Sequence, residues 1–205
     1  LYTQLISSRS ITRERCLLSD LSAAAAQAVR PKAERLHQSI TQTVDPPDLE
    51  IDSDAEGIYN MLRMLLDNAI KFTPEGGGIE VAIRRQGNAA GGAAPSDTEA
   101  ARAVQIVVSD NGIGMTPAEI AGLFRPFTQI DNTLSRRREG LGIGLAYVYK
   151  MAELLGGSVA VASRPVTDRT AELEIRVVDT GIGIAPDMID RIFEKFTQAD
   201  SSTTR

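Results

Sequence analysis

The chain has 205 residues, of which 42% are hydrophobic and 24% are charged, a composition that suits one globular domain with additions. The formal charge of −5 argues against a general nucleic-acid binder, which would carry a basic face. No apolar run approaches the roughly 18 residues that a membrane-spanning helix needs, and the single cysteine, Cys16, excludes an internal disulfide and fits a reducing, cytoplasmic compartment. We therefore expect no membrane contact by this part of the protein.

The first elements along the chain are a helix and two short strands. Residues 1–20 are polar and mixed, and they begin without an initiator Met, so we take the chain as a fragment of a parent that could be membrane-anchored. An Ala-rich helix is predicted over 21–38, with Pro31 interrupting it or redirecting its second half. Apolar runs at 40–44 and 49–51 predict strands separated by a proline-containing turn.

The clearest helix follows these strands. Ser53 and Glu56 have the spacing of a capping box at its start. Apolar residues then recur at helical intervals and form one face, namely Ile58, Met61, Leu62, Leu65, Leu66 and Ala69. The helix is expected to end in the segment 72–78, because a proline and three glycines follow there.

The second half of the chain alternates strands with a further helix. Strands are predicted at 78–84, 104–108, 158–162 and 171–178, and a helix at 145–155 closed by Gly156 and Gly157. The Ala- and Gly-rich residues 87–101 predict a flexible hairpin tip. Strands that alternate with long helices indicate an α/β or α+β sandwich.

The sequence also contains an internal repeat. Residues 104–131 align without a gap with residues 173–200, at an offset of 69. The glycine turn that begins at Asp110 recurs at Asp179, and the motif that begins at Phe124 recurs at Phe193. Because the preceding helix and a later glycine turn have no second copy, the duplication is partial.

Three segments carry residues that could bind a ligand. Asn68 and Lys71 project from one side of the long helix, where an amide oxygen suits Mg²⁺ and a lysine suits phosphate, although a solvated helix edge is the simpler interpretation of two residues alone. Asp110 ends a strand beside Gly112 and Gly114, so its carboxylate could accept a hydrogen bond from an exocyclic amine such as that of adenine.

The third segment, 140–145, places glycines at the start of a helix, where free N–H groups and the helix dipole favour an anion. A dinucleotide-binding loop would need a strand immediately before it. Here the polar residues 135–139 precede it instead, which disfavours that alternative.

These motifs occur in a characteristic order: 65–74, 110–114, 124–127 and 140–145. Together they resemble the ATP-binding domain of sensor histidine kinases, which belongs with the gyrase and Hsp90-type ATPases. The resemblance covers about residues 17–162. It implies an α+β, two-layer sandwich, the Bergerat fold, in which a mixed sheet carries helices on one face and ATP lies on the other side of those helices.

The resemblance also implies roles for individual residues. Asn68 would hold Mg²⁺ and Lys71 would contact the phosphates, as the catalytic pair. Asp110 would bind the adenine amine on a turn shaped by its glycines. The remaining candidate nucleotide-binding residues are Gly112, Gly114, Phe127, Arg138, Gly140, Gly142, Gly144 and Leu145. Phe124 and Phe127 would lie in a mobile lid with Arg136 to Arg138, whose alternative interpretation is a solvated basic loop.

Three residues depart from the family or lack a role in it. Met64 stands where histidine kinases usually carry a second Asn and gyrase-like relatives a general-base Glu. A thioether neither binds Mg²⁺ well nor activates water, so phosphoryl transfer could be weakened while ATP binding survives. The only histidine, His37, is expected at the surface or in packing contacts, so the phosphoacceptor is missing. Cys16 is expected to be a buried small apolar residue.

The sequence predicts the following organisation. Residues 1–165 form the ATP-binding domain, with 1–16 as the end of an upstream dimerisation helix or linker, and 166–205 are a partial repeat that is truncated, recombined or regulatory. The repeat could compete for the strand position of the first copy, but we expect 171–178 to be an edge strand and 187–196 a loosely docked helix.

The resemblance implies a histidine kinase that uses ATP and Mg²⁺ in two-component signal transduction. In a parent that is a homodimer, the phosphate would pass to a histidine-bearing dimerisation domain and then to a response-regulator receiver domain. The alternatives are a catalytically weak or inactive nucleotide-sensing module and a serine kinase of the anti-sigma-factor type.

Overall fold

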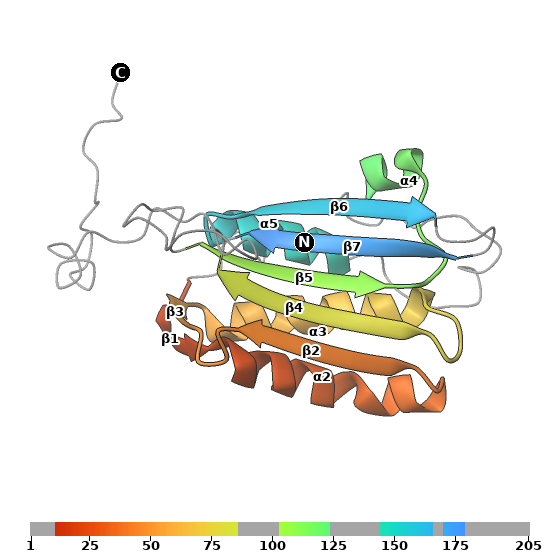
Figure 1. The fold of residues 1–205 in the computed structure, drawn as a ribbon. Coiled ribbons are helices and arrows are strands. Elements are labelled where there is room, and N and C mark those ends of the chain that lie inside the picture. The colour runs from red at the N-terminus through yellow and green to blue at the C-terminus, as the bar shows by residue number, and fades with distance from the viewer. Residues whose placement is uncertain (1–10, 86–102, 124–143, 166–169, 179–205) are drawn as a thin grey trace, which may run out of the picture.

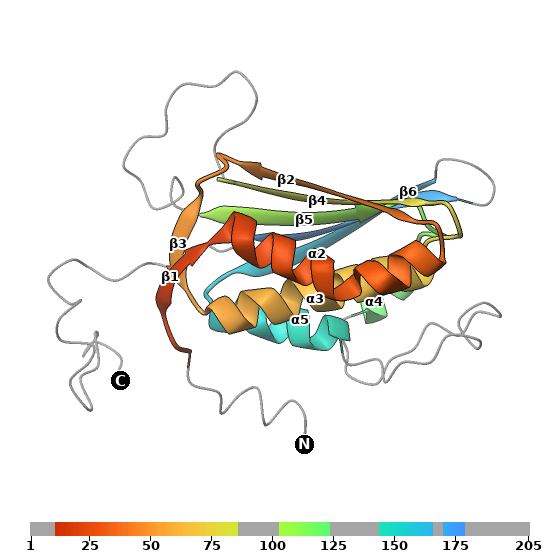
Figure 2. The same ribbon diagram turned by 90° about the horizontal axis from the view of Figure 1, so that it is seen from below.

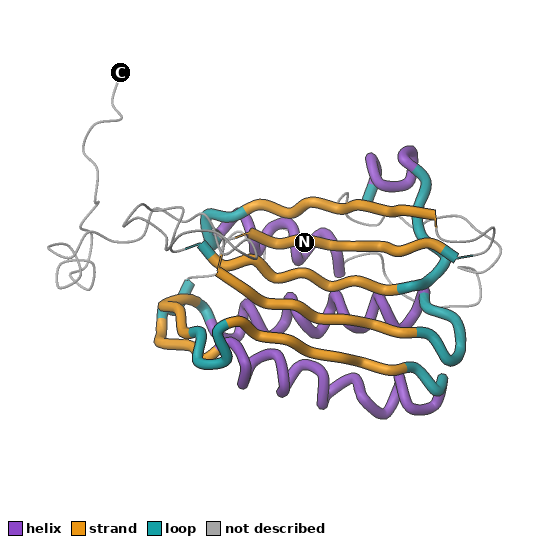
Figure 3. Tube along the Cα trace, in the orientation of Figure 1, coloured by secondary structure: helices purple, strands orange, loops and turns teal. Residues whose placement is uncertain are grey.

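The computed structural model describes residues 11–85, 103–123, 144–165 and 170–178, which form a five-stranded sheet covered by helices on one face (Figures 1 and 3). The strands pair in the order β2-β4-β5-β7-β6. Their bounds are β2 (Ser39–Asp45), β4 (Gly78–Arg85), β5 (Val104–Asp110), β7 (Ala171–Val178) and β6 (Ser158–Pro165). β2 and β4 are parallel and the other neighbours antiparallel, which confirms the predicted mixed sheet.

Three helices form the second layer. They are α2 (Leu18–Arg35), α3 (Ala55–Phe72) and α5 (Gly144–Leu154), and Figure 2 shows them side by side under the sheet. The short helix α4 (Pro117–Gly122) projects at one end of the sheet, beyond β6 (Figure 1). None of the helices within the described ranges is long and apolar enough to cross a membrane.

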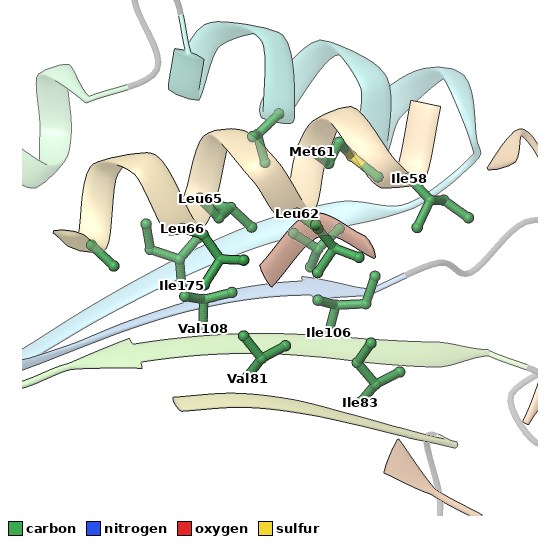
Figure 4. Close-up of a cluster of buried hydrophobic side chains, with 14 of the residues drawn as sticks. Ile58, Met61, Leu62, Leu65, Leu66, Val81, Ile83, Ile106, Val108 and Ile175 are labelled. Carbon is green, nitrogen blue, oxygen red and sulfur yellow. The ribbon is translucent and has the colours of Figure 1, made fainter. Parts of the chain in front are cut away.

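The core lies between α3 and the sheet. The predicted apolar face of α3 is buried as a unit, with Leu62 fully buried and Leu65 and Leu66 at 1% exposure. Figure 4 shows this face directed at side chains of three neighbouring strands, namely Val81, Ile83, Ile106, Val108 and Ile175. Burying each of these large side chains contributes about 1.5–3 kcal/mol, so the packing fixes how α3 lies on the sheet.

A second, two-stranded sheet was not predicted. β1 (Glu14–Leu17) pairs antiparallel with β3 (Glu50–Ser53) at one end of the molecule (Figure 1). Cys16 on β1 is buried as expected, and its Sγ donates to the Ser53 carbonyl oxygen at 3.3 Å. Burial raises the pKa of the Cys16 thiol, which keeps it in the unreactive protonated form.

The helix boundaries differ from the prediction in two places. α2 begins and ends three residues early relative to 21–38 and continues through Pro31 without interruption. The cap of α3 is Asp54 rather than Ser53, because Ser53 is the last residue of β3; the Asp54 carboxylate accepts from the Gly57 N–H at 2.7 Å. The predicted glycine closure of α5 is present, with Gly156 at φ 83°.

The prediction that 171–178 forms an edge strand was wrong. β7 lies between β5 and β6, since it forms an antiparallel hairpin with β6 and pairs along its other side with β5. β5 keeps its place, so the two copies of the repeated strand are neighbours. Leu173 is opposite Asp110 and Val178 opposite Gln105. The tail that follows β7, including the predicted helix 187–196, lies outside the described residues, as does 87–101.

Candidate functional site

Asp110 is the buried carboxylate at the C-terminal end of β5. It is 6% exposed, and its Oδ1 accepts a hydrogen bond from the Gly112 N–H at 2.9 Å. Burial raises the pKa of Asp110 to about 6, while the Gly112 N–H and the Thr73 hydroxyl act in the opposite direction. The carboxyl is therefore largely ionised at pH 7 but close to its protonation range.

The glycine turn after Asp110 is packed against the end of α3. A Cβ on Gly112 would lie 2.5 Å from the Phe72 carbonyl oxygen, which is closer than any side chain could approach. The same oxygen accepts from the Ile113 N–H at 3.2 Å. Gly112 is therefore required here by the close approach of two backbone segments.

Gly114 anchors the other side of the turn. Its φ is 66°, and a Cβ there would lie 2.3 Å from the Ala171 Cβ and 2.8 Å from the Ser163 Oγ. The Met115 N–H donates to the Ser163 hydroxyl at 3.0 Å, and the Ala171 N–H donates to the Gly112 carbonyl at 2.8 Å. The turn is thereby held between α3 and the β6–β7 hairpin.

Two further polar side chains belong to this cluster and were not singled out in the sequence. Asn111 accepts from the Gly78 N–H at 2.8 Å, which ties the turn to the start of β4. Thr73 is fully buried beside the Asp110 carboxyl, although its hydroxyl forms no hydrogen bond of standard geometry with the described residues. The only mark of Thr73 in the sequence is its place directly after the predicted helix and before Pro74, and this place does not reveal its burial.

Asn68 and Lys71 are half-buried on α3. A Cβ on Gly144, the first residue of α5, would lie 3.6 Å from the Asn68 Nδ2 and 3.8 Å from the Met64 Cβ. The Lys71 Nζ lies 5.1 Å from the centroid of the Phe72 ring. The N-terminus of α5, with Gly144 and Leu145, thus adjoins the amide of Asn68.

The structure therefore brings the described candidates to neighbouring parts of α3. Asp110, Gly112 and Gly114 cluster at its C-terminal end, and Gly144 lies beside Asn68. The candidates Phe127, Arg138, Gly140 and Gly142, like Phe124, lie outside the described residues. His37 is exposed, follows α2 at φ 52° and contacts Glu75 at 2.8 Å, which agrees with a surface role.

Comparison with protein families gives a direct match. The family model described as "Histidine kinase-, DNA gyrase B-, and HSP90-like ATPase" matches residues 53–173 and again residues 165–205. The chain belongs to this family. The two-layer fold with a mixed sheet, which the resemblance implied, is the fold of the family's histidine kinase catalytic domains.

Individual relatives place this ATPase-family domain among histidine kinases. An uncharacterized sensor-like histidine kinase of Rhizobium meliloti is 37% identical over 134 residues, which are 65% of this chain and 22% of the relative. The histidine protein kinase DivJ of Caulobacter vibrioides is 28% identical over 155 residues, 76% of this chain and 24% of DivJ. The chain thus spans about a quarter of the length of these relatives.

Among solved structures, full-length ShkA in complex with AMPPNP has a TM-score of 0.68 to this chain at 23% identity. The match covers 90% of this chain and 35% of ShkA. At this identity the likeness concerns the fold. By sequence this chain belongs to the ATPase family named above, and its fold is that of histidine kinase catalytic domains.

Proposed function

We propose that this domain binds Mg-ATP as the catalytic part of a sensor histidine kinase and donates the γ-phosphate to a histidine on a separate dimerisation domain. The observation that carries the proposal is the buried, glycine-flanked carboxylate of Asp110 beside the helix that bears Asn68. The AMPPNP bound to ShkA, a protein of similar fold, supports the same ligand class.

Asp110 supplies recognition of the base. An ionised carboxylate that is excluded from water accepts strongly from an exocyclic amine, and such a bond to a charged group contributes about 1.5–3 kcal/mol. The carboxyl is 6% exposed, so a base that reaches it is itself largely withdrawn from solvent. The absence of a Cβ at Gly112 keeps the turn close to α3 and Asp110 fixed at the end of β5.

Asn68, Lys71 and the start of α5 supply recognition of the phosphates. The first N–H groups of this 11-residue helix lack intrahelical partners and favour an anion. Asn68 would hold Mg²⁺ because its half-buried amide oxygen is a neutral hard ligand next to that helix start. When bound, Mg²⁺ neutralises phosphate charge. Lys71 would add a positive charge, and Phe127, Arg138, Gly140 and Gly142 remain the proposed lid and phosphate-loop residues.

The remaining parts of the proposal concern the parent protein. The ATP-binding domain predicted over 1–165 is proposed to extend through β7, which lies inside its sheet, so 171–178 of the predicted repeat 166–205 belong to it. The upstream helix or linker predicted in 1–16 is proposed only for the residues before β1, because 14–17 pair with β3. The parent is proposed to be a homodimeric, cytoplasmic or membrane-anchored kinase. Its phosphate would be passed from the histidine-bearing dimerisation domain to a receiver domain of a response regulator.

Nucleotide binding is tested by calorimetric titration of the chain with Mg-ADP. We expect Asp110→Asn to weaken the affinity at least tenfold, because about 1.4 kcal/mol corresponds to a factor of ten. Asp67→Asn is the matched control, since Asp67 lies on α3 but pairs with Lys32 of α2. Equal affinity of the Asp110 variant and the parent, or an absence of binding by the parent, would refute the proposal.

Phosphoryl transfer is tested with γ-labelled ATP and the dimerisation domain of the parent protein as acceptor. Label on the acceptor histidine supports the kinase, and binding without label supports the alternative, a nucleotide-sensing module. The residue at position 64 favours that alternative, because Met64 precedes Asn68 by one turn of α3, adjoins the same Gly144 and offers a thioether where a second oxygen ligand would assist. If Met64 limits transfer, Met64→Asn raises the transfer rate at saturating ATP.

A further inference from the structure

Gln38 is a buried polar side chain that caps the end of α3 from another element. It is 7% exposed, and its Nε2 donates to the carbonyl oxygens of Ile70, Thr73 and Pro74 at 3.1, 2.8 and 3.3 Å. A helix leaves its last carbonyl groups without intrahelical partners. The Gln38 amide therefore satisfies the C-terminal end of α3, the helix on which the candidate site is built.

The backbone around Gln38 is fixed by the end of α2. His37 adopts φ 52°, its N–H donates to the Glu34 carbonyl, and the Gln38 N–H donates to the Ala33 carbonyl at 3.0 Å, which is a Schellman motif. α2 and α3 run side by side and end at the same end of the molecule (Figure 2). This motif aims the Gln38 side chain across that end at α3.

The loop after α3 is also bonded to this turn. The Gly76 N–H donates to the Leu36 carbonyl at 2.9 Å, and the Ser39 N–H donates to the Gly77 carbonyl at 3.0 Å. Gln38 lies between these two bonds in the sequence. The segment that carries its three acceptors is therefore bonded to the turn after α2 on both sides of Gln38.

The clamped segment forms the wall beside Asp110. The Phe72 carbonyl contacts Gly112 and accepts from the Ile113 N–H. Thr73, whose carbonyl accepts the shortest of the Gln38 hydrogen bonds, places its fully buried hydroxyl beside the Asp110 carboxyl. A displacement of residues 72 and 73 would therefore change the surroundings of the Asp110 carboxylate, because the Phe72 carbonyl holds the turn that follows Asp110.

We propose that Gln38 is a positioning residue for recognition of the nucleotide base, acting on Asp110 through Thr73. The proposal rests on the nucleotide-binding function proposed above. The Gln38 Oε1 is buried without a hydrogen-bond partner among the described residues. Removing the Gln38 amide would leave the carbonyls of Ile70, Thr73 and Pro74 without this donor, which costs free energy. The stability of each variant is therefore measured beside its binding.

The test compares Gln38→Leu with a matched control, Gln105→Leu. Gln105 is 6% exposed and accepts from the Arg84 Nε at 2.8 Å, but it lies at the opposite end of β5 from Asp110. Both variants replace a buried glutamine by an apolar side chain of similar size. Thermal unfolding midpoints of each variant report any general loss of stability.

Two readouts are measured: the dissociation constant of Mg-ADP between pH 5 and 8, and the pKa of Asp110 in the nucleotide-free protein by carboxyl carbon NMR. In the Gln38 variant we expect binding about tenfold weaker at pH 7, the loss of a well-placed charged hydrogen bond. We also expect the Asp110 pKa to rise further, because the Thr73 hydroxyl no longer lowers it. The acid limb of the binding profile then moves to higher pH.

Thr73→Val provides a second route to the same step, since it removes the hydroxyl and keeps the carbonyl that Gln38 holds. It is expected to raise the Asp110 pKa similarly, and the double variant with Gln38→Leu is expected to add nothing. An unchanged Asp110 pKa in the Gln38 and Thr73 variants, or an equal effect of Gln105→Leu, overturns this proposal. If the parent chain binds no Mg-ADP, the proposed function fails instead, while the pKa measurement still decides whether Gln38 positions Asp110.

Discussion

Replacing Asp110 by Asn is expected to stabilise the fold while it weakens nucleotide binding. Burial raises the pKa of this carboxyl from 3.8 to about 6. At 1.36 kcal/mol per pKa unit, holding the charge in the folded protein at neutral pH costs about 3 kcal/mol, as an upper bound. An asparagine removes that charge, and its Oδ1 can still accept from the Gly112 N–H.

The pH dependence identifies the cause. The folded protein holds the Asp110 proton more tightly than the unfolded chain does. The unfolding free energy of the parent therefore falls by about this amount as pH rises from about 3.8 to about 6. The advantage of Asp110→Asn in unfolding free energy should be near zero below pH 4 and constant above pH 6. Urea unfolding of both proteins at pH 4, 5, 6 and 7.5 measures it. A variant that is less stable at pH 7.5, or an advantage independent of pH, would refute the reasoning.

Three further predictions follow from the contacts. Gly114→Ala should destabilise the fold by about 2–4 kcal/mol, because φ is positive there and the new Cβ would lie 2.3 Å from the Ala171 Cβ. Gly76→Ala should cost only about 1–2 kcal/mol, because its φ of 75° is also positive but no atom lies within 4 Å. Equal losses of unfolding free energy in urea would contradict this. Cys16 should be alkylated by iodoacetamide at pH 8 far more slowly in native than in urea-unfolded protein, since the thiol is buried with a raised pKa. Asp179→Ala should leave the calorimetric affinity for Mg-ADP unchanged, and a loss as large as that of Asp110→Asn would show that the second copy contributes to the site.

Local sequence patterns predicted most helices and strands, but they did not predict which distant strands pair. The apolar face of α3 was readable because helical spacing and burial coincide along one segment. β1 was missed because its four residues show no alternation of burial and their partners in β3 lie more than thirty positions away. The cap of α3 shifted to Asp54 because pairing in β3 already uses Ser53, which a local capping pattern cannot reveal.

The candidate site shows the same division. The order of the motifs predicted that Asn68 and Asp110 belong to one nucleotide site. The contacts that set the position and pKa of Asp110, however, join residues far apart in the chain. Thr73 acts on the pKa of Asp110 from the position directly after α3, and Gln38 donates to the Thr73 carbonyl from the turn after α2. No spacing rule connects these positions, because each contact depends on how the helices pack on the sheet.

The register of β7 determines what the second glycine turn can do. β5 and β7 are antiparallel, and Val178, the last residue of β7, is opposite Gln105 rather than Asp110. Gln105 and Asp110 are five positions apart along β5, a distance of about 17 Å at about 3.4 Å per residue. The chain therefore leaves β7 at the end of the strands opposite the Asp110 cluster. A repeated sequence in an antiparallel neighbour directs its functional end away from the original, so similarity of sequence between the two copies does not by itself create a second binding site.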